Sequence, residues 1–338
     1  MNWETYESNY YGIAKIHNKD DSYCIEQLAY AKKLYDSNLP IIYNQEHFCK
    51  LVGYSKEYVY SASNSPKKFY RTFFIKKKNG GDREINEPLP SLKEIQEWIY
   101  KEILCNIKIS PYAKAYVHGK SIKDNAKFHK RQNKVLTIDL KDFFPSICFN
   151  KVMKVFFNAG YRKPVAVLLA NLCCLDDSLP QGAPTSPYLS NIIASALDDK
   201  IVDFVKNKNI RYTRYADDLT LSGDFDEKIV INKIRKIVSS EGYKINPDKT
   251  RIRKRNQRQE VTGIVVNEKL QVSRKDRRDF RRVLYYIDKY GLEEHLKYVG
   301  NNKNNYIYHF IGKITHASFI NPNDKRLKVY LEKLRSLI

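Results

Sequence analysis

Apolar residues recur along this chain with the spacing of helices over several long segments. They return every three or four positions from Leu92 to Ile107, behind Ser91 and Glu94 at the spacing of a capping box. This spacing predicts a helix that begins at Ser91. Further helices are predicted within 1–70, over 150–159, over 164–174, as one long helix over 187–206, over 226–240 and within 273–337.

Extended segments lie between these helices. Tyr70–Ile75 has strand character, Lys76–Asp82 reads as a turn and Arg83–Asn86 returns, which predicts a hairpin with a cationic tip. The remaining predicted strands are Val135–Leu140, Ile210–Tyr215, Leu219–Ser222 and Val261–Val266. The order of elements predicts an α+β protein with a small sheet and a helical C-terminal lobe.

The composition adds a strong basic bias. The 338 residues include 60 Lys and Arg against 38 Asp and Glu, which gives a formal net charge of +22. Such a balance favours a polyanionic partner, most often nucleic acid. The length suits about two domains, and the hydrophobic content of 42% excludes a disordered tail.

Three other classes of protein are not expected. The longest apolar run, over 165–175, is interrupted by Asn171 and is too short to span a bilayer. Residues 1–4 are polar and acidic, unlike a secretory signal. The six cysteines form no CxxC pair, so we expect no zinc site and interpret them as reduced thiols of a cytoplasmic protein.

Aspartates stand where predicted strands end. Asp139 ends one strand, and Asp217 and Asp218 lie in the tight turn between two others. Aspartate is a poor strand residue, and three nearby carboxylates repel one another without a cation. Two divalent ions between carboxylates are a known solution for phosphoryl transfer, and magnesium suits oxygen ligands. The Asp–Asp pairs at 20–21, 176–177 and 198–199 are expected on the surface.

Three motifs, in this order, resemble those of reverse transcriptases. Segment 139–147 (Asp-Leu-Lys-Asp-Phe-Phe-Pro-Ser-Ile) resembles the first metal-binding motif, 179–187 (Leu-Pro-Gln-Gly-Ala-Pro-Thr-Ser-Pro) the template and nucleotide loop, and 215–218 (Tyr-Ala-Asp-Asp) the catalytic motif. Two shorter segments narrow the resemblance to bacterial retron enzymes. Segment 125–129 (Asn-Ala-Lys-Phe-His) resembles their NAxxH element, and 261–263 (Val-Thr-Gly) their VTG element.

The resemblance implies a right-hand polymerase with a defined division of the chain. It implies an N-terminal helical extension over 1–69 and fingers over 70–134. The palm would cover 135–265, with a small antiparallel sheet, helices and a fingers segment at about 150–187. A short helical thumb over 266–338 would bind RNA.

The same resemblance implies a metal site in the palm. Asp139, Asp217 and Asp218 would be catalytic. Together with the main chain of Leu140 they would bind two Mg²⁺ ions, for which Mn²⁺ is a substitute. Asp142, three residues after Asp139, is interpreted as structural.

A nucleotide site is implied beside it. Phe144 falls where the family places an aromatic ring under the incoming sugar, which favours deoxynucleotides, and glycine at position 182 lets the backbone approach the base pair closely. Which lysine of 76–78 reaches the triphosphate stays open, with Lys77 preferred. The residues expected to bind the nucleotide are Arg83, Lys77, Phe144, Gln181, Gly182 and Lys249.

Arginines cluster over 251–258 and 274–282. Positions 274, 277, 278, 281 and 282 share one face of a helix with few acids between them, and phosphate contacts from such a face weaken with salt. The resemblance implies that the C-terminal region binds a stem-loop of the cognate RNA. The residues expected to bind RNA are Asn125, His129, Arg251, Arg253, Arg255, Arg274, Arg277, Arg278, Arg281 and Arg282.

Taken together, the resemblance implies an RNA-directed DNA polymerase that makes branched multicopy single-stranded DNA (msDNA). The template is a cognate structured non-coding RNA (msr-msd), and an internal guanosine 2′-hydroxyl is the primer. The implied partners are this RNA, its msDNA product, deoxynucleoside triphosphates, a separate effector protein of an anti-phage defence system and host RNase H, with no membrane.

Two alternatives stay open. A different bacterial reverse transcriptase, of the group II intron, diversity-generating or abortive-infection type, would make linear complementary DNA without the branch. A nucleoprotein scaffold of a defence complex would need no catalytic acids, and the intact Asp139, Asp217 and Asp218 argue against it. The cognate RNA, the effector and the oligomeric state are not determined by the sequence.

Overall fold

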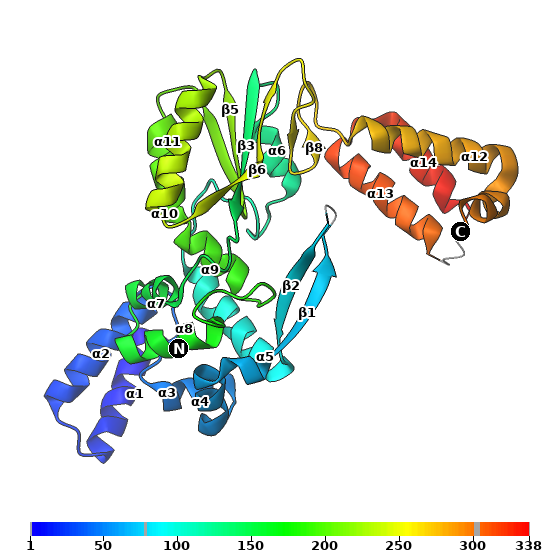
Figure 1. The fold of residues 1–338 in the computed structure, drawn as a ribbon. Helices are drawn as coiled ribbons and strands as arrows, with labels where there is room; N and C mark the ends of the chain where they lie inside the picture. The colour runs from blue at the N-terminus through cyan, green and yellow to red at the C-terminus, as the bar shows by residue number, and fades with distance from the viewer. Residues whose placement is uncertain (1, 78–79, 301–304, 338) are drawn as a thin grey trace. The chain divides into compact units, whose positions relative to one another are not determined.

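The computed structural model describes residues 2–77, 80–300 and 305–337, and Figure 1 shows the chain as a ribbon. The chain forms two compact units, each built from separate stretches of sequence. Unit 1 comprises Met1–Tyr116, Lys141–Asp199 and Val238–Lys244. Unit 2 comprises Val117–Leu140, Lys200–Ile237 and Ile245–Ile338.

Unit 1 is mainly helical and carries one exposed hairpin. Its core includes Leu34, Phe48, Val59, Ile95 and Leu169, all of which are buried. The elements of unit 1 are α1 (Trp3–Ile16), α2 (Asp21–Asp36), α3 (Gln45–Val52), α4 (Lys56–Asn64), β1 (Tyr70–Lys76), β2 (Asp82–Pro88), α5 (Pro90–Trp98), α7 (Phe149–Asn158), α8 (Lys163–Cys173) and α9 (Ser186–Ile193).

The predicted hairpin is confirmed, and the capping box is wrong. Strands β1 and β2 pair antiparallel from Tyr70 opposite Pro88 to Lys76 opposite Asp82. Helix α5 begins one residue before Ser91, at a proline that needs no backbone hydrogen bond in the first turn. The carboxylate of Glu94 instead accepts a hydrogen bond from the Tyr54 hydroxyl at 2.5 Å.

Unit 2 holds the small sheet. Its four strands lie in the order β4-β5-β3-β6, and β5 pairs antiparallel with both β4 and β3. Leu136, Ile138, Leu219 and Leu221 are buried in the sheet. The elements of unit 2 are α6 (Ile122–Phe128), β3 (Lys134–Lys141), β4 (Arg211–Tyr215), β5 (Asp218–Gly223), β6 (Lys244–Lys254), β7 (Glu260–Val261), β8 (Ile264–Val265), α12 (Arg274–Val299), α13 (Tyr306–Ile320) and α14 (Lys325–Arg335).

The C-terminal helices α12, α13 and α14 pack around a core that continues toward β7 and β8. Phe280, Ile314 and Leu334 belong to the same buried cluster as Val261 and Ile264. Within α12, a non-helical backbone at Gly291 marks a kink. Among the described residues, no helix combines the length and the apolar character needed to cross a membrane.

Three expectations about single elements are corrected. The long helix predicted over 187–206 is two helices, α9 and α10 (Ser195–Val205), which meet at Ala194. Strand β6 was not predicted at all. Asp198, expected on the surface, is fully buried. Helix α11 (Glu227–Ser240) matches its prediction closely.

Candidate active site

The register of the sheet places two aspartates opposite each other. Asp139 on β3 pairs with Asp218 on β5. The backbone N–H of Leu140 donates to the carbonyl of Asp217 at 2.9 Å, which holds the β4–β5 turn against the end of β3. Ala216 in that turn has a φ of 56°, a strained value for a residue with a side chain. All three predicted acids therefore meet at one end of this strand pair.

The electrostatics of this cluster are those of confined like charges. Burial, the charge of Asp217 and the charge of Asp139 raise the pKa of Asp218 to about 7. The Lys249 ammonium, on β6, lies 2.9 Å from the Asp139 carboxylate and opposes this effect. Its hydrogen bond to Asp139 raises the pKa of Lys249 in turn. One protein cation therefore partly neutralises the three carboxylates.

The donor set fits magnesium in one of its usual coordination modes. Among the described residues, no three His, Cys, Asp or Glu side chains gather closely enough to hold a metal by themselves. Magnesium, however, is usually held by one or two carboxylates, with water and substrate phosphates in the other positions. Asp139 and Asp218 supply such a pair, and the raised pKa of Asp218 indicates that the site favours a cation.

Unit 1 contains a polar cavity of about 590 Å³ beside the hairpin. Lys77, Arg83 and Gln181, all predicted to bind the nucleotide, line it together. Asp142, which was interpreted as structural, also lines it. Lys78 lies outside the described residues. Cations and an amide on one cavity wall suit a phosphate ligand.

Phe144 and Gly182 also belong to unit 1. The Phe144 ring is half-buried, 5.6 Å from the Phe143 ring and 6.5 Å from the Tyr116 ring between centroids. Gly182 has a φ of 132°, and a Cβ there would lie 2.8 Å from the carbonyl oxygen of Asn86. The close backbone approach at this glycine is therefore to strand β2, a contact that was not expected from the sequence.

The expected RNA contacts of Asn125 and His129 are wrong for this structure, because both side chains are fully buried. The His129 ring lies 2.7 Å from the Ser222 hydroxyl and 2.8 Å from that of Thr213. Thr213 also donates to the Asn125 amide oxygen at 2.5 Å. These contacts join α6 to β4 and β5, so the two residues position the hairpin that carries the acids.

The VTG segment joins the same network. The Asn125 amide donates to the Thr262 hydroxyl at 3.5 Å. Thr262 and Gly263 both have positive φ, as the two central residues of a tight β7–β8 turn require. The structure thus brings together two motifs that lie more than 130 residues apart.

Two basic surfaces of unit 2 contain most of the expected RNA-binding arginines. Arg251 and Arg253 line a cavity of about 550 Å³ that also includes Asp218. Arg255 instead faces Glu268 at 3.4 Å, and Arg282 faces Asp279 at 3.0 Å. A second cavity, between α12 and α14, is lined by Arg274, Arg277, Arg278 and Arg281. Arg326 and Tyr330 also line this second cavity and were not predicted from the sequence.

Comparisons with known proteins agree with this geometry. The model of the family "Reverse transcriptase (RNA-dependent DNA polymerase)" matches residues 75–273. The retron Ec86 reverse transcriptase of Escherichia coli is 36% identical over 260 residues, which cover 75% of this chain and 81% of that protein. The retron Mx65 reverse transcriptase of Myxococcus xanthus is 35% identical over 256 residues, covering 69% of this chain and 60% of that protein.

One solved structure, telomerase from Candida albicans with a telomeric RNA fragment, aligns with a TM-score of 0.43 at 13% identity, covering 79% of this chain and 61% of that one. The family match and the acidic strand ends define an RNA-directed DNA polymerase, and the chain belongs to the reverse transcriptase family. Its similarity to retron enzymes over most of its length places it in the retron group of that family.

Proposed function

We propose that this reverse transcriptase makes branched msDNA from a cognate structured non-coding RNA, primed by the 2′-hydroxyl of an internal guanosine. The supporting observation is the meeting of Asp139, Asp217 and Asp218 at one sheet end in a chain of the retron group. The product, an effector protein, host RNase H and a role in anti-phage defence follow from the resemblance to retron enzymes.

The carboxylates of unit 2 would bind the metal. Reverse transcriptases use divalent metal ions, and we assign Asp139, Asp217, Asp218 and the Leu140 carbonyl as ligands of two Mg²⁺. When bound, such ions activate the attacking hydroxyl and stabilise the leaving pyrophosphate. Lys249 holds Asp139 at 2.9 Å and supplies a positive charge for the departing pyrophosphate.

Unit 1 would bind the incoming nucleotide. Arg83 and Lys77 bind its triphosphate, and Gln181 lines the same cavity. Phe144 selects against a ribose 2′-hydroxyl by its bulk. The β1–β2 hairpin then belongs to the fingers, the sheet to the palm and helices α12–α14 to the thumb.

The nucleic acid product tests this proposal. The full chain is expressed from its native locus, and the nucleic acid that co-purifies with it is sequenced before and after treatment with a 2′,5′-debranching enzyme. We expect a short DNA whose attached RNA is released by that enzyme. Linear DNA alone would contradict the retron product while leaving reverse transcription intact. No primer extension on any RNA template would contradict the polymerase itself.

A further inference from the structure

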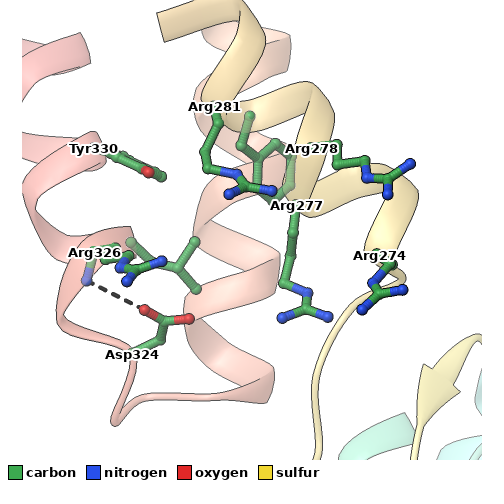
Figure 2. Close-up of a pocket in the computed structure, with 9 residues that line it drawn as sticks. Arg274, Arg277, Arg278, Arg281, Asp324, Arg326 and Tyr330 are labelled. Atoms are coloured by element: carbon green, nitrogen blue, oxygen red, sulfur yellow. Dashed lines mark hydrogen bonds between the residues drawn. The ribbon is translucent and has the colours of Figure 1, made fainter. Parts of the chain in front are cut away.

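Helix α12 and the start of α14 enclose a cavity of about 400 Å³, which we call the α12–α14 pocket (Figure 2). Phe280 and Leu327 form its buried apolar wall. Its volume is that of a small-molecule site. The arginines that line it are Arg274, Arg277, Arg278 and Arg281 from α12 and Arg326 from α14.

These five arginines carry charge that the described part of the chain does not neutralise. None of them forms an ion pair with a described acid, whereas the next arginine, Arg282, pairs with Asp279 at 3.0 Å. The Nε atom of Arg277 is also buried without a hydrogen-bond acceptor among the described residues. A buried donor without a partner is unfavourable, and so is a group of like charges around one cavity. Both features indicate an anionic ligand.

The opposite wall limits how much negative charge this ligand can carry. The Asp324 carboxylate caps α14 by accepting from the backbone N–H of Arg326 at 3.2 Å, and it lines the pocket. In Figure 2, Arg277 and Arg281 point toward Asp324 and Arg326. A chain of phosphates filling the pocket would place negative charge against Asp324. A ligand with one phosphate and an uncharged remainder avoids that repulsion.

Tyr330 supplies a surface for the uncharged part. Its half-buried ring lines the pocket and makes no contact with another ring or with a cation among the described residues. Aromatic faces and guanidinium planes stack on nucleobases that have left a helix. One phosphate and one flat base together describe a single nucleotide.

We propose that the α12–α14 pocket binds one unpaired nucleotide, with its phosphate on Arg277 and Arg281 and its base against Tyr330. This inference rests on the proposed function, in which a structured RNA is the partner. It adds a site that reads a bulged or flipped nucleotide, in addition to the phosphate contacts of the arginine face. The nucleotide belongs to an RNA or is a free mononucleotide, and the experiment separates these sources.

The test compares two fluorescent RNA hairpins that share one stem and differ only in a single unpaired nucleotide. Their binding to the full chain is measured by anisotropy at one salt concentration. We expect the bulged hairpin to bind at least about fivefold more tightly, as one stacked base does. Competition by adenosine and guanosine monophosphates at millimolar concentration would point to a free nucleotide as the ligand, and no competition to RNA.

Variants separate stacking from charge. Tyr330→Leu should remove the preference for the bulge and leave binding of the paired hairpin unchanged, whereas Tyr330→Phe should keep the preference. Arg281→Gln should weaken both hairpins. The matched controls are Tyr308→Leu, an exposed tyrosine on α13, and Lys328→Gln, an exposed cation on α14 outside the pocket.

Equal binding of both hairpins by the unmodified chain would overturn the proposal, and so would a bulge preference that survives Tyr330→Leu. Thermal melting of each variant checks folding, and Tyr330→Phe keeps the test valid if the leucine variant unfolds. Primer extension on a linear RNA template is measured on the same preparations. Its loss would count against the proposed polymerase function, independently of the pocket.

Discussion

Asp218 has a pKa of about 7 because burial and two neighbouring carboxylates oppose its ionised form. The isolated side chain would be fully ionised at neutral pH. Lys249 offsets part of this effect through Asp139. A divalent cation between the carboxylates would lower the pKa again and favour the charged cluster. At the scale of the residue, the acids are destabilised by one another and adapted to a cation.

The double substitution Asp217→Asn with Asp218→Asn tests this assignment. We expect DNA synthesis on a primed RNA template to fall by at least about 1000-fold, because the amides no longer hold a cation. The melting temperature should stay the same or rise, since like-charge repulsion is removed. Asp20→Asn with Asp21→Asn, on the exposed start of α2, is the matched control and should change neither quantity. Unchanged synthesis in the first variant would refute the catalytic assignment.

His129 shows a second residue-scale effect. Burial and the nearby charge of Arg211 lower the pKa of His129 to about 3, so the ring is neutral in the folded chain. The ring bonds only to hydroxyl groups among the described residues, at Ser222 and Thr213. In the unfolded chain a histidine titrates near pH 6.5. The unfolded state therefore binds the extra proton between about pH 6.5 and 3.

This difference makes stability depend on pH with a known sign. As the pH falls from 7.5 to 5.5, the free energy of unfolding should lose about 1 kcal/mol through His129 alone. His129→Gln should be less stable at pH 7.5 but should lose about 1 kcal/mol less over the same range. Urea unfolding at both pH values measures this, with the exposed His118→Gln as control. An equal loss in the unmodified chain and in His129→Gln would contradict a neutral buried ring.

Among the elements, the loop 179–185 and strand β2 form one structure in unit 1. The Asn86 N–H donates to the Gln181 carbonyl at 2.8 Å, and Gly182 passes so close to β2 that only a hydrogen atom fits. Gln181 and Arg83 therefore line their cavity from segments that are held together by backbone contacts. The nucleotide cavity depends on this contact.

Gly182→Ala should disturb both the contact and the cavity. A Cβ at 2.8 Å from a carbonyl oxygen and a positive φ together should cost about 2 kcal/mol of stability. The apparent KM for deoxynucleoside triphosphates should rise. Gly312→Ala on α13, where no atom lies within 4 Å of the added methyl group, should instead stabilise by up to about 1 kcal/mol. Chemical unfolding and steady-state kinetics measure these effects, and equal stabilities of the two variants would contradict the close approach.

Elements with a clean apolar period were predictable, and elements with a mixed composition were not. The β1–β2 hairpin, β3 and α11 follow from their patterns. Strand β6 was missed because its sequence over 244–254 contains Pro, Asp and many cations, which are rare in strands. It lies at the edge of its sheet, where pairing with one neighbour and charged side chains are tolerated.

At the scale of the whole molecule, the charge of +22 separates into paired and unpaired cations. Arg255 and Arg258 face Glu268 and Glu260, respectively. Arg251 and Arg253 instead line the cavity that includes Asp218. These two arginines are available to neutralise RNA or DNA phosphates near the acids of unit 2.

The salt dependence of RNA binding measures this contribution. For the unmodified chain, the logarithm of affinity should fall linearly with the logarithm of salt concentration. Arg251→Gln with Arg253→Gln should reduce that slope by about 2, one for each phosphate that is no longer neutralised. Arg235→Gln with Lys236→Gln on α11 is the charge-matched control. An equal reduction in both variants would mean that only net charge matters.

The sequence by itself determined the class of the protein, since the motifs around Asp139, Gln181 and Asp217 and the basic composition depend on short local segments. Only the tertiary structure decided that Asn125 and His129 are buried supports rather than RNA contacts. It also decided that Tyr330 and Arg326 complete a pocket with α12. The physical reason is that burial and distant contacts arise from strand register and helix packing, which bring together residues whose separation along the chain carries no local signal.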